Sequence, residues 1–341
     1  MKPILGITMG DAAGIGPELI LKAFRNDNLF RLCRPLVIGS AAVMDLYRKR
    51  FEISLPFHIV KDSESANYET GTLDVLDLGG VDAGKLKIAV VDPEPGRAAV
   101  IYTQEAGRMA MAGTIEAIVS APLNKESMRA AGYKYEGQTQ ILAELTGAKR
   151  FGMILLLGHV RVMMLTTHCA LRRACDAVTK EKVLSMIELC DESLRSFGID
   201  HPRIAVAGLN PHSGEGGLFG TEEILGSIPA IEEAKSRGIN VAGPVPADVV
   251  FAKARDGEYD LVLAMYHDQA NMAAKLLGFG EVVTLLAGLP IIRTSVGHGT
   301  AFDIAGQGIA DENNLVKAIE AAAELAARKK EKAKWELSRT I

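Results

Sequence analysis

Cysteine is scarce in this sequence, with four in 341 residues and no CxxC pair. The four are Cys33, Cys169, Cys175 and Cys190. This scarcity excludes a disulfide framework and a zinc site built from paired cysteines. The first stretch, MKPILGITMG, reaches Gly and Asp too soon to be a secretory signal. We therefore expect reduced thiols in a cytoplasmic protein.

Long apolar runs and an excess of one charge are also absent. No apolar run approaches the length of about 18 residues that a membrane-spanning helix needs. The net charge is −4, the pI is about 6.0, and Lys and Arg form no run. Nucleic acid and membrane surfaces are therefore not expected partners. With 48% hydrophobic and 23% charged residues, the chain fits a globular protein of two domains or one large one.

Short apolar runs alternate with segments of helical periodicity along the whole chain. This alternation predicts an α/β fold, with a parallel sheet and helices on both of its faces. Expected strands include residues 4–9, 35–40, 57–60, 73–78, 117–124, 281–288 and 290–296, and expected helices include 96–112 and 179–197. No internal repeat or low-complexity linker marks a domain boundary.

Three of the expected strands end in a histidine. The stretch DLVLAMYHDQ, at 260–269, contains His267; VMMLTTH ends in His168, and RIAVAGLNPH ends in His212. Ligands of open α/β folds bind at the carboxyl ends of strands, so the three imidazoles are expected at one sheet edge. Scattered histidines are more often surface or hydrogen-bonded core residues. The repeated placement instead favours a catalytic divalent-metal site with an open fourth position.

The segment GDAAGIGPE, at 10–18, follows the first expected strand and precedes a helix. A glycine-rich turn before a helix can present backbone N–H groups to an anion. A tight βα turn with Pro17 at the helix start is an equal alternative. The glycines do not match GxGxxG, so a dinucleotide fingerprint of that type is not supported.

Six separated segments, in order, resemble the 4-hydroxythreonine-4-phosphate dehydrogenase family. They are MGDAAGIGPE, VSAPLNKE, GLNPHSGEGGLFG, the PAD of PVPADVVF, AMYHDQ and GLPIIRTSVGHGTAFDIAG. The start GDAAGIGPE, the KLLGF at 275–279 and the TAFDIA at 300–305 are more similar to the D-threonate or D-erythronate 4-phosphate branch than to the vitamin B6 branch.

The resemblance implies a fold similar to isocitrate and isopropylmalate dehydrogenases, with two α/β/α domains around a cleft. Residues 1–130 and 285–341 are expected to form a discontinuous nucleotide-binding domain. Residues 131–284 are expected to form the metal, substrate and dimerisation domain.

The resemblance also implies a set of site residues. One divalent ion (Zn, Mg, Mn or Co) would be bound by the three histidines at the interface of a homodimer. NAD would be held by the loop HGTAFDIAGQGIAD. The implied positions are His168, His212 and His267 for the metal; Gln138, Thr139, Lys275, Thr284 and Arg293 for the substrate; Lys275 and Asp248 for catalysis; and His298, Gly299, Thr300 and Asp303 for NAD.

Some of these positions have a structural alternative. Arg293 lies in an apolar strand, where an unpaired charge would cost several kcal/mol, so a partner anion is implied. Asp248 has a substrate or proton-transfer role, or it caps the following helix. Lys275 anchors phosphate, stabilises an alkoxide or is a solvated side chain. Asp303 belongs to the nucleotide loop or is a local turn or helix residue, and Asp268 is expected to orient His267 or a neighbouring group.

Three positions depart from the family pattern. Gln138 replaces a His, Thr284 replaces an Asn, and Gly297 replaces the Asp of DHG. A glutamine keeps hydrogen-bonding capacity but cannot be cationic, so it would hold an anion less strongly. These departures affect the expected identity of the substrate more than the expected reaction. The SVGHG form is similar to relatives that act on terephthalate dihydrodiol.

The expected function is NAD- and metal-dependent oxidation of the 3-hydroxyl of D-threonate or D-erythronate 4-phosphate, followed by decarboxylation. One alternative is oxidation of 4-phosphohydroxy-L-threonine in pyridoxal phosphate synthesis, and another is oxidation of a non-phosphorylated cis-dihydrodiol. A different class, a non-catalytic binder of metal and sugar acid, is also open.

Overall fold

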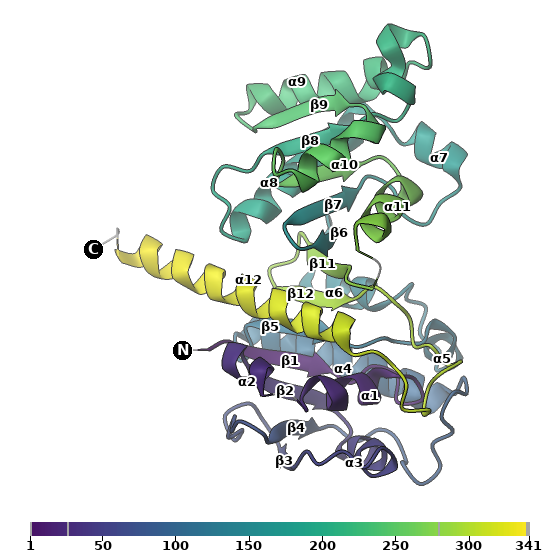
Figure 1. Cartoon of the computed structure of the whole chain (residues 1–341), viewed down its shortest axis with the longest axis vertical. Helices are drawn as coiled ribbons and strands as arrows, with labels where there is room; N and C mark the ends of the chain where they lie inside the picture. Colours follow the sequence, from purple (N-terminus) through teal and green to yellow (C-terminus); the bar gives the residue numbers. More distant parts are fainter. Residues whose placement is uncertain (1, 26, 279, 339–341) are drawn as a thin grey trace. The chain divides into compact units, whose positions relative to one another are not determined.

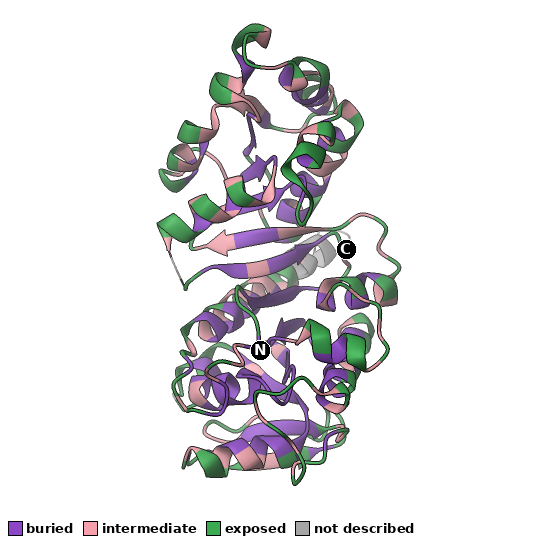
Figure 2. Cartoon of the chain, turned by 90° about the vertical axis from the view of Figure 1, so that its right-hand side faces the viewer, coloured by how far each residue is buried: buried purple, intermediate pink, exposed green. Residues whose placement is uncertain are grey.

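The structure is a computed structural model that describes residues 2–25, 27–278 and 280–338 (Figure 1). Strands and helices alternate along the chain, which confirms the predicted α/β class. The central strands are the most buried elements, and the helices expose one face (Figure 2). In the described residues, no helix is long and apolar enough to cross a membrane.

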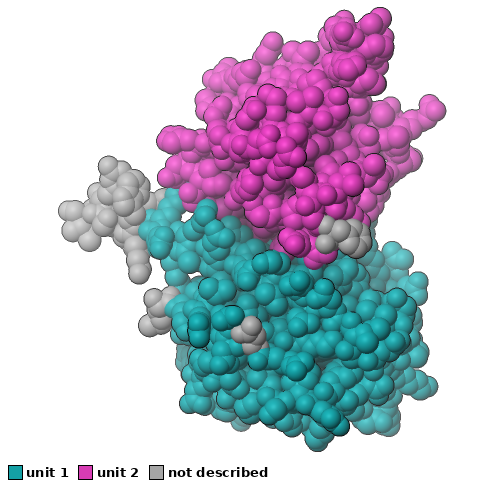
Figure 3. All heavy atoms as spheres, viewed as in Figure 1, with its two compact units in different colours: residues 1–149, 289–341 teal, residues 150–288 magenta. Residues whose placement is uncertain are grey.

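The chain divides into two compact units, which Figure 3 colours separately. Unit 1 comprises Met1–Lys149 and Leu289–Ile341, and unit 2 comprises Arg150–Gly288. The first unit is therefore built from both ends of the chain. The sequence placed the boundaries at 130 and 284, and the assignment of nucleotide and metal functions to the two units stays a prediction.

Unit 1 is organised on a parallel sheet. The strand order is β3 (Phe57–Val60), β4 (Leu73–Asp77), β2 (Arg34–Gly39), β1 (Ile4–Thr8), β5 (Ala117–Ser120) and β12 (Arg293–Val296). Its helices are α1 (Gly16–Ala23), α2 (Asn28–Leu32), α3 (Ala41–Arg50), α4 (Pro93–Ala112), α5 (Lys125–Ala130), α6 (Gln138–Thr146) and α12 (Asn313–Ser338). Both α4 and α12 pack against β1 and β5.

Unit 2 has a mixed sheet. Its strand order is β11 (Val283–Ala287), β6 (Gly152–Leu157), β7 (Val160–Met164), β10 (Leu261–Ala264), β8 (Ile204–Ala207) and β9 (Val241–Val245). Strands β7, β10, β8 and β9 run parallel, whereas β6 is antiparallel to both of its neighbours. The helical elements are α7 (Leu171–Asp176), α8 (Lys180–Ser196), η1 (Pro211–Gly217), η2 (Glu223–Ser227), α9 (Ile228–Ser236), α10 (Ala247–Arg255) and α11 (His267–Leu277).

Local sequence signals account for several helix boundaries. The Asp92 side chain caps α4 by accepting from Glu94 N at 2.8 Å, Pro93 occupies the first helical position, and Gly113 ends the helix at φ 75°. The Thr179 hydroxyl caps α8 by accepting from Lys182 N. Because such caps satisfy the free N–H groups of a first turn, the expected helix boundaries lie within a few residues of the observed ones.

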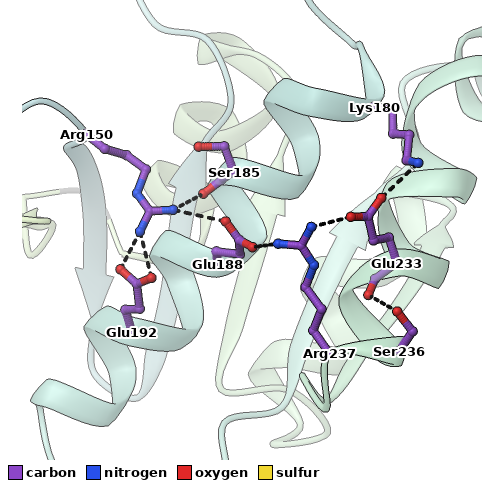
Figure 4. A network of polar contacts seen from close by, with 8 residues as sticks. All are labelled: Arg150, Lys180, Ser185, Glu188, Glu192, Glu233, Ser236 and Arg237. Atoms are coloured by element: carbon purple, nitrogen blue, oxygen red, sulfur yellow. Dashed lines mark hydrogen bonds and ion pairs between the residues drawn. The ribbon is translucent and has the colours of Figure 1, made fainter.

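A network of charges joins α8 to α9 in unit 2 (Figure 4). Glu188 accepts from Arg150 at 3.2 Å and also pairs with Arg237. Glu233 pairs with Arg237 and with Lys180. Charges of opposite sign alternate through the network, in which Glu188 and Glu233 each bridge two cations and Glu192 pairs with Arg150.

Candidate functional site

The three predicted histidines follow three neighbouring parallel strands of unit 2. β10 pairs with β7 on one side and with β8 on the other. His168 lies four residues beyond β7, His267 begins α11 three residues beyond β10, and His212 lies in η1 after β8. The carboxyl ends of these strands therefore form one sheet edge, as the sequence indicated.

Two of the three imidazoles lie together. The ring centroids of His168 and His267 are 5.6 Å apart. His267 Nδ1 lies 3.1 Å from Asp268 Oδ1, which agrees with the expected orienting role of Asp268. His212 instead lies beside Phe219, with ring centroids 6.3 Å apart. Within the described part of one chain, no group of three or more His, Cys, Asp or Glu side chains is placed to hold a metal ion.

Two further side chains cross-link the three strand ends. Gln269 accepts from Met265 N at 2.7 Å and donates to Gly208 O at 2.9 Å, so it joins the end of β10 to the end of β8. The Thr166 hydroxyl donates to Met265 O at 2.9 Å and joins β7 to β10. These amide and hydroxyl bonds fix the backbone from which the histidines project.

The other predicted residues of unit 2 lie on nearby elements. Lys275 lies two turns beyond His267 on α11, is exposed, and has no ion-pair partner in the described chain. Asp248 is exposed in the first turn of α10, and no side chain caps that helix, so the capping alternative is not observed. Thr284 is half-buried on β11 opposite Leu155.

In unit 1 the structure brings Arg293 and Gln138 together. Arg293 Nη2 donates to Gln138 Oε1 at 3.1 Å, and Arg293 Nε donates to Ser120 Oγ at 3.0 Å. Gln138 Nε2 in turn donates to Ala121 O at 2.8 Å. Arg293 is 5% exposed, and burial lowers its pKa from 12.5 to about 10. Among the residues that the structure describes, no carboxylate pairs with this guanidinium.

Helix α6 begins at the same place. Gln138 is its first residue and Thr139 its second, and Thr139 is half-buried. The described residues supply neither a side-chain cap nor an acidic residue for its first turn. The Lys125 side chain runs past this end, with Cε 3.9 Å from the point that a Cβ on Gly137 would occupy. Free N–H groups, a lysine and a buried arginine together favour an anion.

Helix α6 is held in position by apolar packing. Ile141 of α6, Val100 of α4 and Met128 of α5 form one buried cluster. Burial of each such side chain stabilises the fold by about 1.5–3 kcal/mol. This packing fixes the helix end that carries Gln138.

The expected nucleotide loop is anchored by residues far away in the sequence. Thr300 is buried, and its carbonyl accepts from Ile15 N at 3.1 Å while its hydroxyl accepts from Asn124 Nδ2 at 3.3 Å. A Cβ on Gly14 would lie 2.9 Å from Thr300 Cβ, so this contact requires glycine. His298, Gly299 and Asp303 are exposed.

Three charged side chains of α1 and α3 hold the second half of this loop. Lys22 Nζ donates to Gly308 O at 2.8 Å and to Ala310 O at 2.7 Å. The buried Glu18 accepts from Ala310 N, and Arg50 Nε donates to Gly306 O, each at 2.8 Å. Sequence reasoning missed all three. The signal that was available is a Glu–Lys pair four residues apart on a helix that is otherwise apolar.

The glycine-rich turn 10–16 has the internal hydrogen bonds expected of a tight βα turn, the second of the two alternatives for this segment. The N–H groups of Asp11, Gly14 and Ile15 donate to carbonyl oxygens, and Ala13 N donates to Asp11 Oδ1 at 2.9 Å. These groups are therefore not available to an anion. Burial raises the pKa of Asp11 from 3.8 to about 6, although the bond from Ala13 N lowers it.

Comparison with known proteins decides the family. The family described as pyridoxal phosphate biosynthetic protein PdxA matches residues 31–322. The chain belongs to the PdxA family. It is 46% identical over 330 residues to a protein of Oceanobacillus iheyensis named "Putative D-threonate 4-phosphate dehydrogenase", covering 96% of this chain and 99% of that protein.

Solved structures of PdxA-family proteins have the same fold. A 4-hydroxythreonine-4-phosphate dehydrogenase from Burkholderia phymatum is 43% identical and superposes with a TM-score of 0.87, covering 95% of this chain and 98% of that one. The enzyme of that name from Klebsiella pneumoniae is 39% identical, with a TM-score of 0.90 and coverage of 95% and 99%. The predicted family is confirmed.

Proposed function

We propose that this protein oxidises the 3-hydroxyl of a 4-phosphorylated four-carbon hydroxy acid, D-threonate or D-erythronate 4-phosphate, with NAD and one divalent metal ion, and that decarboxylation follows. The observation that carries the proposal is the buried Arg293, which has only neutral hydrogen-bond partners. A guanidinium removed from water without a carboxylate is disfavoured, and a bound phosphate or carboxylate would offset that cost.

The arrangement around Arg293 suits a phosphorylated acid. Nη1 of Arg293 has no hydrogen-bond partner in the described chain, so one edge of its planar fork is left for a ligand. Helix α6 adds the partial positive charge of its N-terminus, and Thr139 adds a hydroxyl. We assign the acid's anionic groups to Arg293, Gln138, Thr139, Lys275 and Thr284.

The histidine edge of unit 2 fits two of the three ligands of a divalent ion. His168 and His267 are adjacent, and an imidazole is a preferred ligand of such ions. We infer that the set is completed across a homodimer, in which His212 is the third ligand. A divalent ion bound there would lower the pKa of the substrate hydroxyl and polarise the ketone that oxidation forms.

The remaining roles fall to exposed groups of unit 2 and to the loop of unit 1. Asp248 would accept the hydroxyl proton, and bound NAD would supply the acceptor for the hydride of the substrate carbon. Lys275 holds the developing negative charge on the substrate oxygen. Breaking the bond to the carboxyl carbon then releases CO2, and the electron pair stays on the substrate until a proton is added. The residues that would hold NAD are His298, Gly299, Thr300 and Asp303.

Exposed apolar side chains support the homodimer. Leu218, Phe219 and Leu225 follow the His212 segment, and Leu225 is 71% exposed. Met272 and Leu276 lie on α11 after His267, and Leu276 is 85% exposed. Exposed apolar groups of this size on the elements that carry the histidines are typical of a protein interface.

The cysteines support a cytoplasmic location. All four are unpaired, and Cys33 and Cys190 are buried. Burial raises the pKa of Cys33 to about 12, which keeps its thiol protonated and unreactive. Free thiols of this kind are typical of proteins in a reducing compartment.

The test is NADH formation from D-threonate 4-phosphate, D-erythronate 4-phosphate, 4-phosphohydroxy-L-threonine and a cis-dihydrodiol, each with a divalent metal and with a chelator. We expect turnover of a phosphorylated four-carbon acid that the chelator abolishes. Turnover of the dihydrodiol alone would contradict the proposed substrate. Binding of NAD without turnover of any compound would instead favour a non-catalytic binder.

A further inference from the structure

The segment that carries His212 has an uncommon backbone. Residues 212–216 all have positive φ, between 42° and 79°. Three of them, His212, Ser213 and Glu215, are not glycine. Residues other than glycine rarely adopt this left-handed region, and a run of them persists only where surrounding contacts hold it. The structure must therefore contain an anchor for this segment.

Glu223 is that anchor. It lies at the start of η2 and is 1% exposed. Its Oε1 accepts from both Leu209 N and Asn210 N at 2.8 Å, and its Oε2 accepts from Asn210 Nδ2 at 2.8 Å. A single buried carboxylate thus binds the two residues through which the chain leaves β8 and enters the left-handed segment.

The same carboxylate also packs against the middle of the segment. A Cβ on Gly214 would lie 2.8 Å from Glu223 Oε2, so the left-handed backbone passes directly over the carboxyl group. The segment is therefore fixed both at its entry and at its centre. Because His212 lies between these two points, the position of its imidazole depends on Glu223.

We infer that Glu223 is a positioning residue for His212, which sets the affinity of the histidine site for its metal ion without binding the ion itself. The inference rests on the proposed role of His212 as a metal ligand. Groups that hold a metal ligand through hydrogen bonds commonly change metal affinity about 10- to 100-fold when they are replaced.

The neighbouring Glu222 provides a matched control. Its Oε2 accepts from Asn210 Nδ2 at 2.7 Å, whereas the N–H groups of Leu209 and Asn210 donate to Glu223. The two glutamates are adjacent, and replacing either one by glutamine removes one negative charge. A difference between Glu222→Gln and Glu223→Gln therefore reports on the backbone anchor and not on net charge.

The experiment is calorimetric titration of the chelator-treated full chain with Zn²⁺ and with Co²⁺, together with circular dichroism and the midpoint of thermal unfolding. We expect Glu223→Gln to weaken metal binding about tenfold or more while the protein remains folded, and Glu222→Gln to change it less than about threefold. His212→Ala should weaken binding at least as much as Glu223→Gln.

The outcomes separate the role of His212 as a metal ligand from the role of Glu223 in positioning it. If His212→Ala weakens binding and Glu223→Gln does not, the positioning role is wrong and the metal site stands. Unchanged binding in His212→Ala would remove the proposed ligand and the positioning role with it. Should Glu223→Gln fail to fold, Asn210→Ala removes both bonds that Asn210 Nδ2 donates, to Glu223 Oε2 and to Glu222 Oε2, and metal affinity equal to the parent in that variant would overturn the inference.

Discussion

Arg293 Nη2 donates a hydrogen bond to Gln138 Oε1 over 3.1 Å, so a neutral amide and not a carboxylate holds a buried guanidinium. The pair joins the first residue of β12 to the first residue of α6, which are 155 positions apart. Within the described residues the charge of Arg293 thus has only neutral partners, and several consequences of the proposed anion site can be measured.

Arg293→Gln should raise KM for the phosphorylated acid by roughly 10- to 100-fold, because a hydrogen bond to a charged group contributes about 1.5–3 kcal/mol. KM for NAD should not change. The variant without ligand should unfold at the same temperature as the parent or higher, since a buried unpaired charge is removed. Inorganic phosphate should raise the unfolding midpoint of the parent but not of the variant. Arg108→Gln, which removes a surface partner of Glu105, is the control.

Asp11→Asn should remove a pH dependence of stability. The folded pKa of about 6 exceeds the ordinary value of 3.8, so the folded state binds the proton more strongly. The free energy of unfolding therefore falls as pH rises from about 4 to about 6, by up to about 3 kcal/mol. Asparagine can still accept from Ala13 N. We expect the variant to melt at a higher temperature than the parent at pH 7.5, with no gain near pH 4. A lower midpoint at pH 7.5 would show that the carboxylate is stabilising.

Arg50→Met should weaken NAD binding through the loop 298–311. The substitution removes the bond from Arg50 Nε to Gly306 O, so the loop loses one of the three side chains that hold it. We expect KM for NAD to rise about threefold to tenfold, with KM for the acid unchanged. Arg48→Met on the same helix, which removes a partner of Asp45, serves as the comparison. An equal effect of both variants would mean that the loop is not involved.

Glu188→Gln should lower the stability of unit 2 in a salt-dependent manner. Glu188 is the only carboxylate in Figure 4 that bridges Arg150 and Arg237. Partly exposed pairs contribute about 0.2–1 kcal/mol each, and salt screens them. We expect the unfolding midpoint to fall by a few degrees at low ionic strength and by less in about 1 M salt. Glu258→Gln, which breaks the isolated pair with Lys253, should have a smaller effect. A salt-independent loss would indicate packing instead.

The strands and the longer helices were predictable because their signals are local. The cap at Asp92 and the left-handed Gly113 delimit α4, and the apolar run before His267 delimits β10. The shared edge for the three histidines followed from strand–helix alternation. The left-handed segment 212–216 was not predictable in detail, because its conformation depends on a carboxylate that lies beyond it in the chain.

The hydrogen-bonded arrangement around Arg293 was predictable only in part. An arginine in an apolar strand indicates a buried partner, and the family resemblance added Gln138. Neither revealed that Ser120 is the other side-chain hydrogen-bond partner of Arg293, because this contact depends on the pairing of β12 with β5. The anchors Glu18, Lys22 and Arg50 were missed for the same reason, since each binds a loop more than 250 residues away.

The most direct test of the central claim compares NADH formation from D-threonate 4-phosphate with that from unphosphorylated D-threonate, at saturating NAD and divalent metal. A site built to hold a phosphate rejects a substrate that lacks it, so kcat/KM should favour the phosphorylated acid by at least about 100-fold. Arg293→Gln should reduce that preference. Equal kcat/KM values for the two acids, unchanged in Arg293→Gln, would contradict the assignment of this protein to phosphorylated substrates.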